Sequence, residues 1–182
     1  MTTCLNAQSG VEWAHLHLRG NLVGKILSLE ELLAVRERLK AQGKTVVLTN
    51  GIFDLLHVGH VRYLRGAKAL GDVLIVGLNS DASAQALKGP KRPLVPQGER
   101  AELLAALEAV DYVVLFDELT AERLVAALQP EIYAKGGDWA LESLPEVGAV
   151  AEYGGRIEIL PQVPGRSTQV LIEAILERYG KT

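Results

Sequence analysis

The sequence has almost no cysteine and no long hydrophobic run. Cys4 is the single cysteine among 182 residues, so an internal disulfide cannot form, and this argues against a disulfide-built secreted domain. No uninterrupted apolar stretch approaches the roughly 18 residues of a membrane span. The first twenty residues lack the apolar core that a signal peptide needs, because they contain Glu12, His15, His17 and Arg19. We therefore expect a cytoplasmic protein with no membrane contact.

The sequence also lacks a strong excess of charge of one sign. Nineteen Lys and Arg residues oppose 22 Asp and Glu residues, which leaves a net charge of −3. This balance argues against a nucleic-acid-binding surface, although it permits a local phosphate site. Hydrophobic residues make up 48% and charged residues 23%, ordinary values that exclude a disordered or fibrous protein. The length is sufficient for one domain without a metal or disulfide.

What the sequence does contain is an alternation of strand-like and helix-like segments from Ile26 onward. The patterns predict strands over 45–49, 73–78, 112–116, 132–134 and 157–160, and helices over 29–42, 61–70, 99–109, 120–128, 145–153 and 167–179. Ser28 and Glu31 have the spacing of a capping box at the first helix start. Such alternation predicts an α/β fold: a doubly wound, Rossmann-like, five-stranded parallel sheet in a three-layer α/β/α arrangement.

The domain prediction follows from the same pattern. Residues 26–182 are expected to form a single domain, and residues 1–25 an N-terminal extension of unknown role. An edge strand, a dimer arm and a mobile tail are all open for that extension. In doubly wound sheets ligands bind beyond the carboxyl ends of the strands, where the winding reverses, so the connections after the strands are the places to search for chemistry.

The connection after the first predicted strand carries two histidines. His57 and His60 stand three residues apart at the point where the loop turns into a helix, so they share one face of the first helical turn. Free backbone N–H groups and the positive end of the helix dipole favour anions at the same place. Gly51 and Gly59 would let the backbone approach a ligand closely. This arrangement predicts a polyphosphate site in which the imidazoles stabilise developing negative charge.

Less specific interpretations of the pair remain open at this point. Two histidines three apart could bind a metal ion, but the segment supplies no third ligand, and a purely structural pair is an equal alternative when the two residues are considered alone. A dinucleotide oxidoreductase is excluded because no Gly-x-Gly-x-x-Gly follows the first predicted strand.

The surrounding segment favours a family. Gly51-x-Phe53-Asp54-x-x-His57-x-Gly59-His60 resembles the signature of the HxGH nucleotidyltransferases, which include cytidylyltransferases and small-molecule adenylyltransferases. From about Lys25 to the C-terminus the chain looks most like the D-glycero-β-D-manno-heptose 1-phosphate adenylyltransferases. Further matching stretches are Thr49–Asp54, Asn79–Asp81, Leu87–Gly89 with Arg92-Pro93, Glu99-Arg100 and Lys135–Asp138. The resemblance implies that a sugar 1-phosphate attacks the α-phosphorus of ATP and pyrophosphate leaves, giving ADP-heptose.

The resemblance also implies roles for individual residues. His57 and His60 would hold α- and β-phosphate oxygens, and Lys88, expected in a loop beyond the second strand, would hold the sugar phosphate. Arg92 and Arg100 could supply further phosphate contacts, with solvated charges as their alternative. Nucleotide or phosphate binding is expected from these residues as a group: Asn50, Gly51, Phe53, Asp54, Gly59, Arg92, Arg100, Lys135, Gly136, Gly137, Asp138, Ser167 and Thr168.

Some members of that group have a second interpretation. Ser167 or Thr168 would also serve as a helix N-cap, and the resemblance lets the same hydroxyls hold the β- and γ-phosphates. Asp54 is expected to orient the histidine-bearing loop, with positioning of Mg²⁺ as its second candidate role. No protein metal ligand is assigned, because Mg²⁺ would enter mainly through the ATP phosphates.

The chain departs from the family pattern at two positions. Gln169 stands where relatives usually have a second Thr, which puts one hydroxyl contact in doubt, and Ile52 replaces a common Cys. The expected partners are ATP and a sugar phosphate, with a homodimer as the expected assembly. Because these 182 residues show no sugar-kinase domain, a separate kinase is expected to supply the substrate. A glycerol-3-phosphate cytidylyltransferase and a non-catalytic ATP-sensing module are the alternative functions.

Overall fold

The computed structural model of the chain describes residues 25–137 and 139–180. The strands are β1 (Lys25–Leu27), β2 (Val46–Gly51), β3 (Val73–Asn79), β4 (Tyr112–Phe116), β5 (Ile132–Gly136) and β6 (Arg156–Leu160). The helices are α1 (Leu29–Ala41), α2 (Val58–Lys68), α3 (Asp81–Lys88), α4 (Gln97–Ala105), α5 (Glu122–Leu128), the 3₁₀ turn η2 (Leu141–Ser143), α6 (Val147–Glu152) and α7 (Thr168–Tyr179). The predictions for residues 1–24 and for Asp138 lie outside the described residues.

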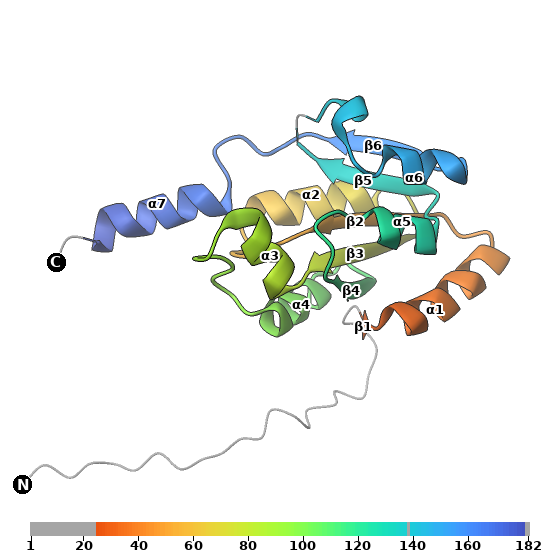
Figure 1. Cartoon of the computed structure of the whole chain (residues 1–182), viewed down its shortest axis with the longest axis horizontal. Helices are drawn as coiled ribbons and strands as arrows, with labels where there is room; N and C mark the ends of the chain where they lie inside the picture. Colours follow the sequence, from red (N-terminus) through yellow and green to blue (C-terminus); the bar gives the residue numbers. More distant parts are fainter. Residues whose placement is uncertain (1–24, 138, 181–182) are drawn as a thin grey trace, which may run out of the picture.

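The strands form one parallel sheet in the order β1-β4-β3-β2-β5-β6. The chain steps outward from β2 through β3 to β4 and then returns to place β5 on the other side of β2 (Figure 1). The winding therefore reverses at β2, between β3 and β5. The doubly wound parallel sheet is confirmed, and its carboxyl edge beside β2 and β5 is the expected ligand site.

The predicted strand number was wrong, because the sheet has six strands rather than five. The additional strand is β1, whose three residues pair with Tyr112–Val114 of β4 at the edge of the sheet. A segment this short spans barely one period of alternation, so the pattern that predicts longer strands has too little sequence to act on.

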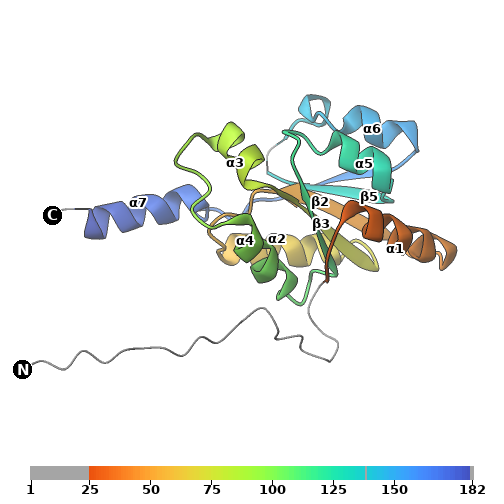
Figure 2. The same ribbon diagram turned by 60° about the horizontal axis from the view of Figure 1, so that its bottom comes forward.

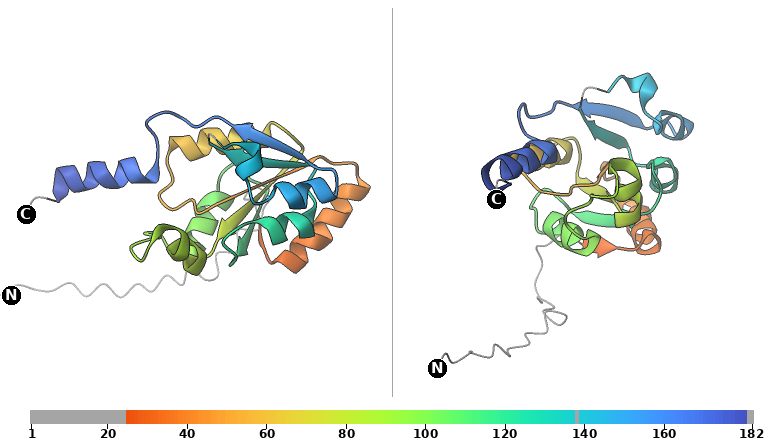
Figure 3. Two further views of the ribbon diagram at one scale, coloured as in Figure 1. Left: turned by 45° about the horizontal axis from the view of Figure 1, so that its top comes forward. Right: turned by 60° about the vertical axis from the view of Figure 1, so that its left-hand side comes forward.

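Helices cover both faces of the sheet and bury two separate apolar clusters. One face packs Leu64 and Ala67 of α2 and Leu104 of α4 against the sheet. The opposite face packs α1, α5 and α6 through residues such as Leu32 and Leu128. Figure 2 shows α2 and α1 on opposite sides of the strands, and the right-hand view of Figure 3 shows α1, α5 and α6 along one side. The three-layer α/β/α arrangement is confirmed.

Local sequence signals account for several helix boundaries. Ser28 and Glu31 form the predicted capping box, with both reciprocal hydrogen bonds present. Gly43, at φ +65°, follows α1 in the left-handed conformation that ends helices without cost for glycine. Helix α3 was not predicted, and Lys88, its last residue, was expected in a loop. Its signal is Ser80, whose side chain accepts a hydrogen bond from the Ser83 backbone, an N-cap pattern.

Helix α7 differs from the others in its contacts. It extends away from the body of the molecule (Figure 1), and none of its described residues is buried. Its attachment lies at its first turn, next to the carboxyl edge of the sheet, where Thr168 donates to the Leu55 carbonyl at 3.4 Å. Within the part of the chain that the structure describes, no helix has the length and apolar character to cross a bilayer.

Candidate active site

A pocket of about 280 Å³ lies beyond the carboxyl ends of β2, β5 and β6. Its walls come from three places in the chain: Asn50–Phe53 with His57, Gly59, His60 and Tyr63; Lys135 with Gly136; and Pro161–Val163 with Arg166–Thr168. These segments adjoin the position where the winding reverses, which is the place where doubly wound sheets bind ligands.

The two histidines of the pocket stack on each other. Their ring centroids are 3.8 Å apart and their planes differ by 23°. His57 is the N-cap residue of α2 in extended conformation, and its side chain makes no capping hydrogen bond, so the first N–H groups of α2 receive no side-chain cap. The Phe53 ring packs on His60 with centroids 5.3 Å apart. Phe53 has φ 47°, a strained backbone conformation of the kind that clusters at functional sites.

The environment keeps both imidazoles neutral near pH 7. Burial and then the neighbouring His57 lower the pKa of His60 to about 4. Burial, followed by the positive charge of Arg166, lowers the pKa of His57. The Nδ1 atoms of both rings are buried and have no hydrogen-bond partner among the described residues. The Nε2 atoms are therefore the ones that can meet a ligand.

Gly59 is required by the packing between these rings and the segment before α7. A Cβ atom at Gly59 would lie 2.8 Å from the His57 ring and 3.3 Å from the Arg166 Cβ. Any larger residue would separate α2 from Arg166, so glycine lets these groups share one wall of the pocket.

The start of α7 also borders the pocket, next to the histidines. Ser167 is the N-cap and accepts a hydrogen bond from the Val170 backbone at 3.1 Å, so the predicted capping interpretation is confirmed. Ser167, Thr168 and Arg166 all line the pocket. The N-termini of α2 and α7 thus border the same cavity together with a guanidinium group, an arrangement that favours a ligand with several negative charges.

A polar cluster lies at the ends of β2 and β5, and its members Asn50 and Lys135 line the pocket. Lys135 Nζ donates to Asn50 Oδ1 at 2.8 Å, and the Tyr133 hydroxyl donates to the same oxygen at 2.6 Å. Lys135 Nζ lies 3.8 Å from the buried Glu146 carboxylate. Burial lowers the pKa of Lys135, while Glu146 raises it.

Several predicted site residues do not line the pocket. Asp54 is buried, and its carboxylate accepts hydrogen bonds from Arg92 Nε and from the Leu94 and Val95 backbones. Burial opposes ionisation of Asp54, but these hydrogen bonds and the charge of Arg92 outweigh it and lower its pKa. Asp54 therefore connects the histidine-bearing loop to residues 92–95. For Arg92 this ion pair is the contact that the structure provides.

Arg100 is fully buried. Its guanidinium donates to the carbonyls of Val95, Ile52 and Asn79 and to the Asp81 carboxylate, so four of its five N–H groups are engaged by the scaffold. Its direct contact with phosphate stays a prediction, as does that of Arg92.

Lys88 and Gly137 also lie outside the pocket lining. Lys88 is the exposed last residue of α3, not a loop residue as predicted. Gly137 follows β5 with φ +124° and donates to the Leu160 carbonyl at 3.0 Å. In the described residues no group of three His, Cys, Asp or Glu side chains is arranged to hold a metal ion.

The structure adds residues to the predicted site. Besides Ile52, which lies between the predicted Gly51 and Phe53, the residues Tyr63, Pro161, Gln162, Val163 and Arg166 line the pocket but were not predicted as site residues. Arg166 had a usable signal, because it directly precedes the predicted Ser167-Thr168 helix start. The others had none: Tyr63 reaches the pocket from the second turn of α2, and residues 161–163 depend on where β6 ends.

A doubly wound parallel sheet with a pocket where the winding reverses is the architecture of α/β nucleotide-binding proteins, and comparison with known proteins identifies the family. The chain belongs to the cytidylyltransferase-like family, whose model matches residues 48–160. That range includes most of β2, the histidine pair and the β5 segment of the pocket, and it ends just before Pro161.

Individual relatives are similar over most of the chain. The identity is 54% over 157 residues to the bifunctional protein HldE of Geobacter metallireducens and 55% over 155 residues to that of Syntrophotalea carbinolica. These alignments cover 86% and 85% of this chain but 32% of each relative, so the chain spans about a third of their length. A solved lipopolysaccharide core biosynthesis protein from Thermoplasma volcanium is 29% identical with a TM-score of 0.55, covering 66% of this chain and 98% of that one.

Proposed function

We propose that the protein is an adenylyltransferase that transfers AMP from ATP to D-glycero-β-D-manno-heptose 1-phosphate, releasing pyrophosphate and forming ADP-heptose. The observation that carries this proposal is the pair of stacked, neutral imidazoles at the N-terminus of α2, which border the same pocket as Arg166 and the N-terminus of α7. Hydrogen-bond donors concentrated there suit a triphosphate. The similarity to HldE proteins and to a lipopolysaccharide core biosynthesis protein supports heptose as the sugar.

In the proposed reaction a phosphate oxygen of the sugar 1-phosphate attacks the α-phosphorus of ATP. A new P–O bond forms as the bond between the α-phosphorus and the bridging oxygen breaks, and pyrophosphate leaves with the electron pair. Such transfers need alignment and charge stabilisation more than covalent chemistry. His57 and His60 would donate from Nε2 to the α- and β-phosphate oxygens, while Arg166, Ser167 and Thr168 would hold the distal phosphates.

Lys88 would hold the incoming sugar phosphate. Lys88 is the exposed last residue of α3. The sugar phosphate would therefore have to bind between the Lys88 ammonium and the pocket. The segment that starts with Lys135 and Gly136 would lie along the nucleoside. Asp138 would contribute to nucleotide binding from the same segment.

Mg²⁺ is proposed to enter with ATP. The chemistry of the described residues fits this role: Asp54, the predicted carboxylate nearest the histidines in sequence, is occupied by Arg92 and two backbone N–H groups. The ion would therefore be held by ATP oxygens and water. When bound, it would neutralise part of the charge that accumulates on the phosphates.

The test is pyrophosphate release, with mass spectrometry to identify the nucleotide sugar. ATP and CTP are each offered with heptose 1-phosphate and with glycerol 3-phosphate. The proposal expects release of pyrophosphate and formation of ADP-heptose with the first pair. Turnover restricted to CTP and glycerol 3-phosphate would instead establish the alternative cytidylyltransferase. ATP binding without turnover of any pair would establish a sensor.

The proposal extends to the assembly of the protein, its location and the source of its sugar 1-phosphate. We propose a cytoplasmic homodimer whose sugar 1-phosphate comes from a sugar kinase. Sedimentation or light scattering measures the assembly directly, and a monomer at micromolar concentration would contradict that part without affecting the reaction.

A further inference from the structure

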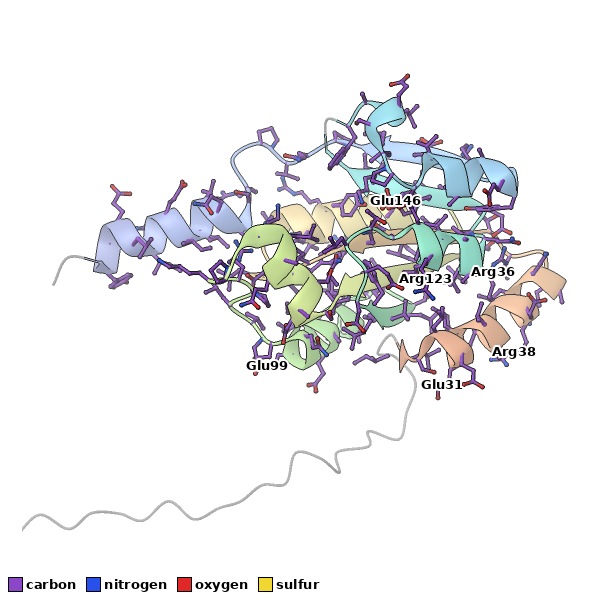
Figure 4. All side chains as sticks on the ribbon, viewed as in Figure 1. Glu31, Arg36, Arg38, Glu99, Arg123 and Glu146 are labelled. Carbon is purple, nitrogen blue, oxygen red and sulfur yellow. The ribbon has the colours of Figure 1, made fainter. Side chains whose placement is uncertain are left out.

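The polar cluster at the ends of β2 and β5 joins two residues that line the pocket, Asn50 and Lys135, to two that lie behind it, Tyr133 and Glu146. Asn50 ends β2, Tyr133 and Lys135 lie on β5, and Glu146 is the N-cap residue of α6. Figure 4 shows Glu146 within the body of the molecule, whereas Glu31, Arg38 and Glu99 lie toward its periphery. Two residues of β5 therefore contact the Asn50 amide, and Glu146 reaches the cluster through Lys135.

The contacts define which end of the Asn50 amide faces the cluster. A lysine ammonium carries only donors, so the Asn50 atom 2.8 Å from Lys135 Nζ must be the oxygen. Lys135 Nζ also lies 3.2 Å from the Tyr133 hydroxyl oxygen. The Tyr133 proton is therefore directed to Asn50 Oδ1 at 2.6 Å. Burial, followed by the charge of Glu146, raises the pKa of Tyr133, so this proton is retained.

The opposite end of the amide is thereby directed away from the cluster. Asn50 Nδ2 donates to no described residue, and it is not among the buried atoms without a partner. Because Asn50 lines the pocket, its two N–H groups are available to a ligand there. The ligand atom that meets them must be a hydrogen-bond acceptor.

Glu146 provides the charge that this arrangement needs. It is 2% exposed, and its Oε1 accepts from the Ala121 backbone at 3.0 Å while lying 3.8 Å from Lys135 Nζ. Its Oε2 is buried without a hydrogen-bond partner. Burying a carboxylate in this way is unfavourable unless a cation compensates it. Lys135 supplies that cation, and Glu146 in turn favours the ammonium form that donates to Asn50.

We propose that Glu146 and Tyr133 are positioning residues that act through Asn50, holding its amide so that Nδ2 donates to an oxygen of a substrate in the pocket. Lys135 connects Glu146 to Asn50 in this network. The inference rests on the proposed function only for the identity of the substrate. The oxygen acceptor can belong to ATP or to the sugar phosphate, and the KM values of the two substrates distinguish these sources.

The test is a double-mutant cycle on kcat/KM for pyrophosphate release. Asn50→Ala is expected to lower kcat/KM by about 10-fold or more, and Glu146→Gln and Tyr133→Phe by about 3- to 10-fold each. In the Asn50→Ala background, Glu146→Gln and Tyr133→Phe are expected to have less than about a 2-fold further effect, because coupled residues are not additive. Effects that multiply instead would overturn the proposal.

Tyr153→Phe is the matched control. Tyr153 packs against the same core cluster as Tyr133, and its buried hydroxyl has no partner in the described residues. Its removal is expected to leave kcat/KM unchanged. A loss equal to that of Tyr133→Phe would assign both effects to core packing and would contradict a positioning role.

Asn50→Asp keeps the test valid if another variant folds poorly. A carboxylate still accepts from Lys135 and Tyr133, so the thermal midpoint is expected to hold or rise. The substrate oxygen then faces a carboxylate oxygen instead of an N–H donor, and kcat/KM is expected to fall about 10-fold or more. A folded Asn50→Asp protein with wild-type kcat/KM overturns the inference.

Failure of the proposed function would be recognised separately, because the wild-type protein would then release no pyrophosphate. In that case the same cycle is measured by calorimetry on the binding of ATP and of the sugar phosphate. Coupling in either affinity supports the positioning network, and additive losses or none in both reject it.

Discussion

At the scale of single residues, His60 has the clearest relation between environment and chemistry. Burial and His57 lower its pKa to about 4, so near pH 7 it is a neutral hydrogen-bond donor rather than a resident cation. Its stacking on His57 and its tilted contact with the Phe53 ring restrict its orientation. A preoriented donor of this kind contributes most where charge develops during the reaction.

We therefore expect His60→Ala to affect turnover more than ATP binding. Removing one such donor is expected to lower kcat by about 10²- to 10³-fold, with a change in the ATP dissociation constant below about 5-fold. Pyrophosphate release gives the first quantity and calorimetry the second. Comparable losses in both would show uniform binding and would favour the ATP-sensing alternative.

The residue scale also shows what the sequence alone could supply. His57 and His60 were predictable because their spacing and their place after a strand require no knowledge of distant contacts. Arg100 was not, since a Glu-Arg pair in a helix is typical of a solvated surface, yet Arg100 is fully buried by carbonyls from three other segments. Its environment depends on tertiary packing that one sequence does not display.

At the scale of elements, Asp54 connects the loop after β2 to the segment between α3 and α4. Three donors converge on one buried carboxylate, from Arg92, Leu94 and Val95. The loop that bears the histidines and residues 92–95 are thereby coupled. The predicted role of Asp54 as an orienting residue thus has a structural basis, although its effect on catalysis stays a prediction.

We expect Asp54→Ala to destabilise the protein by about 3 kcal/mol, because it leaves a largely buried guanidinium and two N–H groups without their acceptor. The measurement is urea unfolding. Glu108→Ala is the control: Glu108 is 94% exposed and pairs with Arg65 at 3.9 Å, so the expected change is below about 0.5 kcal/mol. Equal effects of the two substitutions would refute the coupling of these segments.

A second connection joins α1 to the turn between α5 and β5. Arg36, buried on α1, donates to the carbonyls of Leu128 and Gln129 and to the Glu131 carboxylate. Arg36→Ala is expected to cost about 3 kcal/mol of unfolding free energy, because it leaves the buried Leu128 carbonyl and the part-buried Gln129 carbonyl without their donor. Arg38→Ala, at an exposed position of the same helix, is the matched control. A loss below about 1 kcal/mol for Arg36→Ala would contradict this role.

The elements differ in how far their patterns predicted them. Strands β3 and β4 were predicted almost to the residue because apolar, β-branched runs of five or more residues are distinctive. Helix α3 was missed because it has only eight residues, which are too few to show a clear apolar periodicity; its one local signal is the N-cap Ser80. Strand β1 exists through its pairing with β4, a contact far away in sequence.

At the scale of the whole molecule, the pattern of alternation predicted the layers and the winding but not the sixth strand. The doubly wound sheet follows from parallel strands and right-handed crossovers, so it required only the order of elements. The extent of the pocket required more, since Pro161–Val163 and Arg166 depend on the direction in which the chain leaves β6. Global stability likewise depends on groups that tertiary structure brings together.

The dependence of stability on pH is the prediction that belongs to this scale. The pKa of His60 is about 4 in the folded protein and near 6.5 when the chain is unfolded, so between these values the unfolded state binds more protons. Stability is therefore expected to fall as the pH decreases from about 6.5 to 4, by up to about 3 kcal/mol from His60. The lowered pKa of His57 acts in the same direction.

Carboxylates extend the same trend to lower pH. Asp54 has a lowered pKa in the folded protein, so its contribution is present above its unfolded pKa of 3.8 and is lost as the pH falls through its folded value. Urea unfolding measured across this range, for the wild-type protein and for His60→Gln, separates the two windows. The variant is expected to have a flatter profile between about pH 6.5 and 4 and an unchanged decline below it. Parallel profiles in the upper window would show that His60 remains accessible to protons, and the pocket would then lack the dry, preoriented imidazole pair on which the proposed chemistry depends.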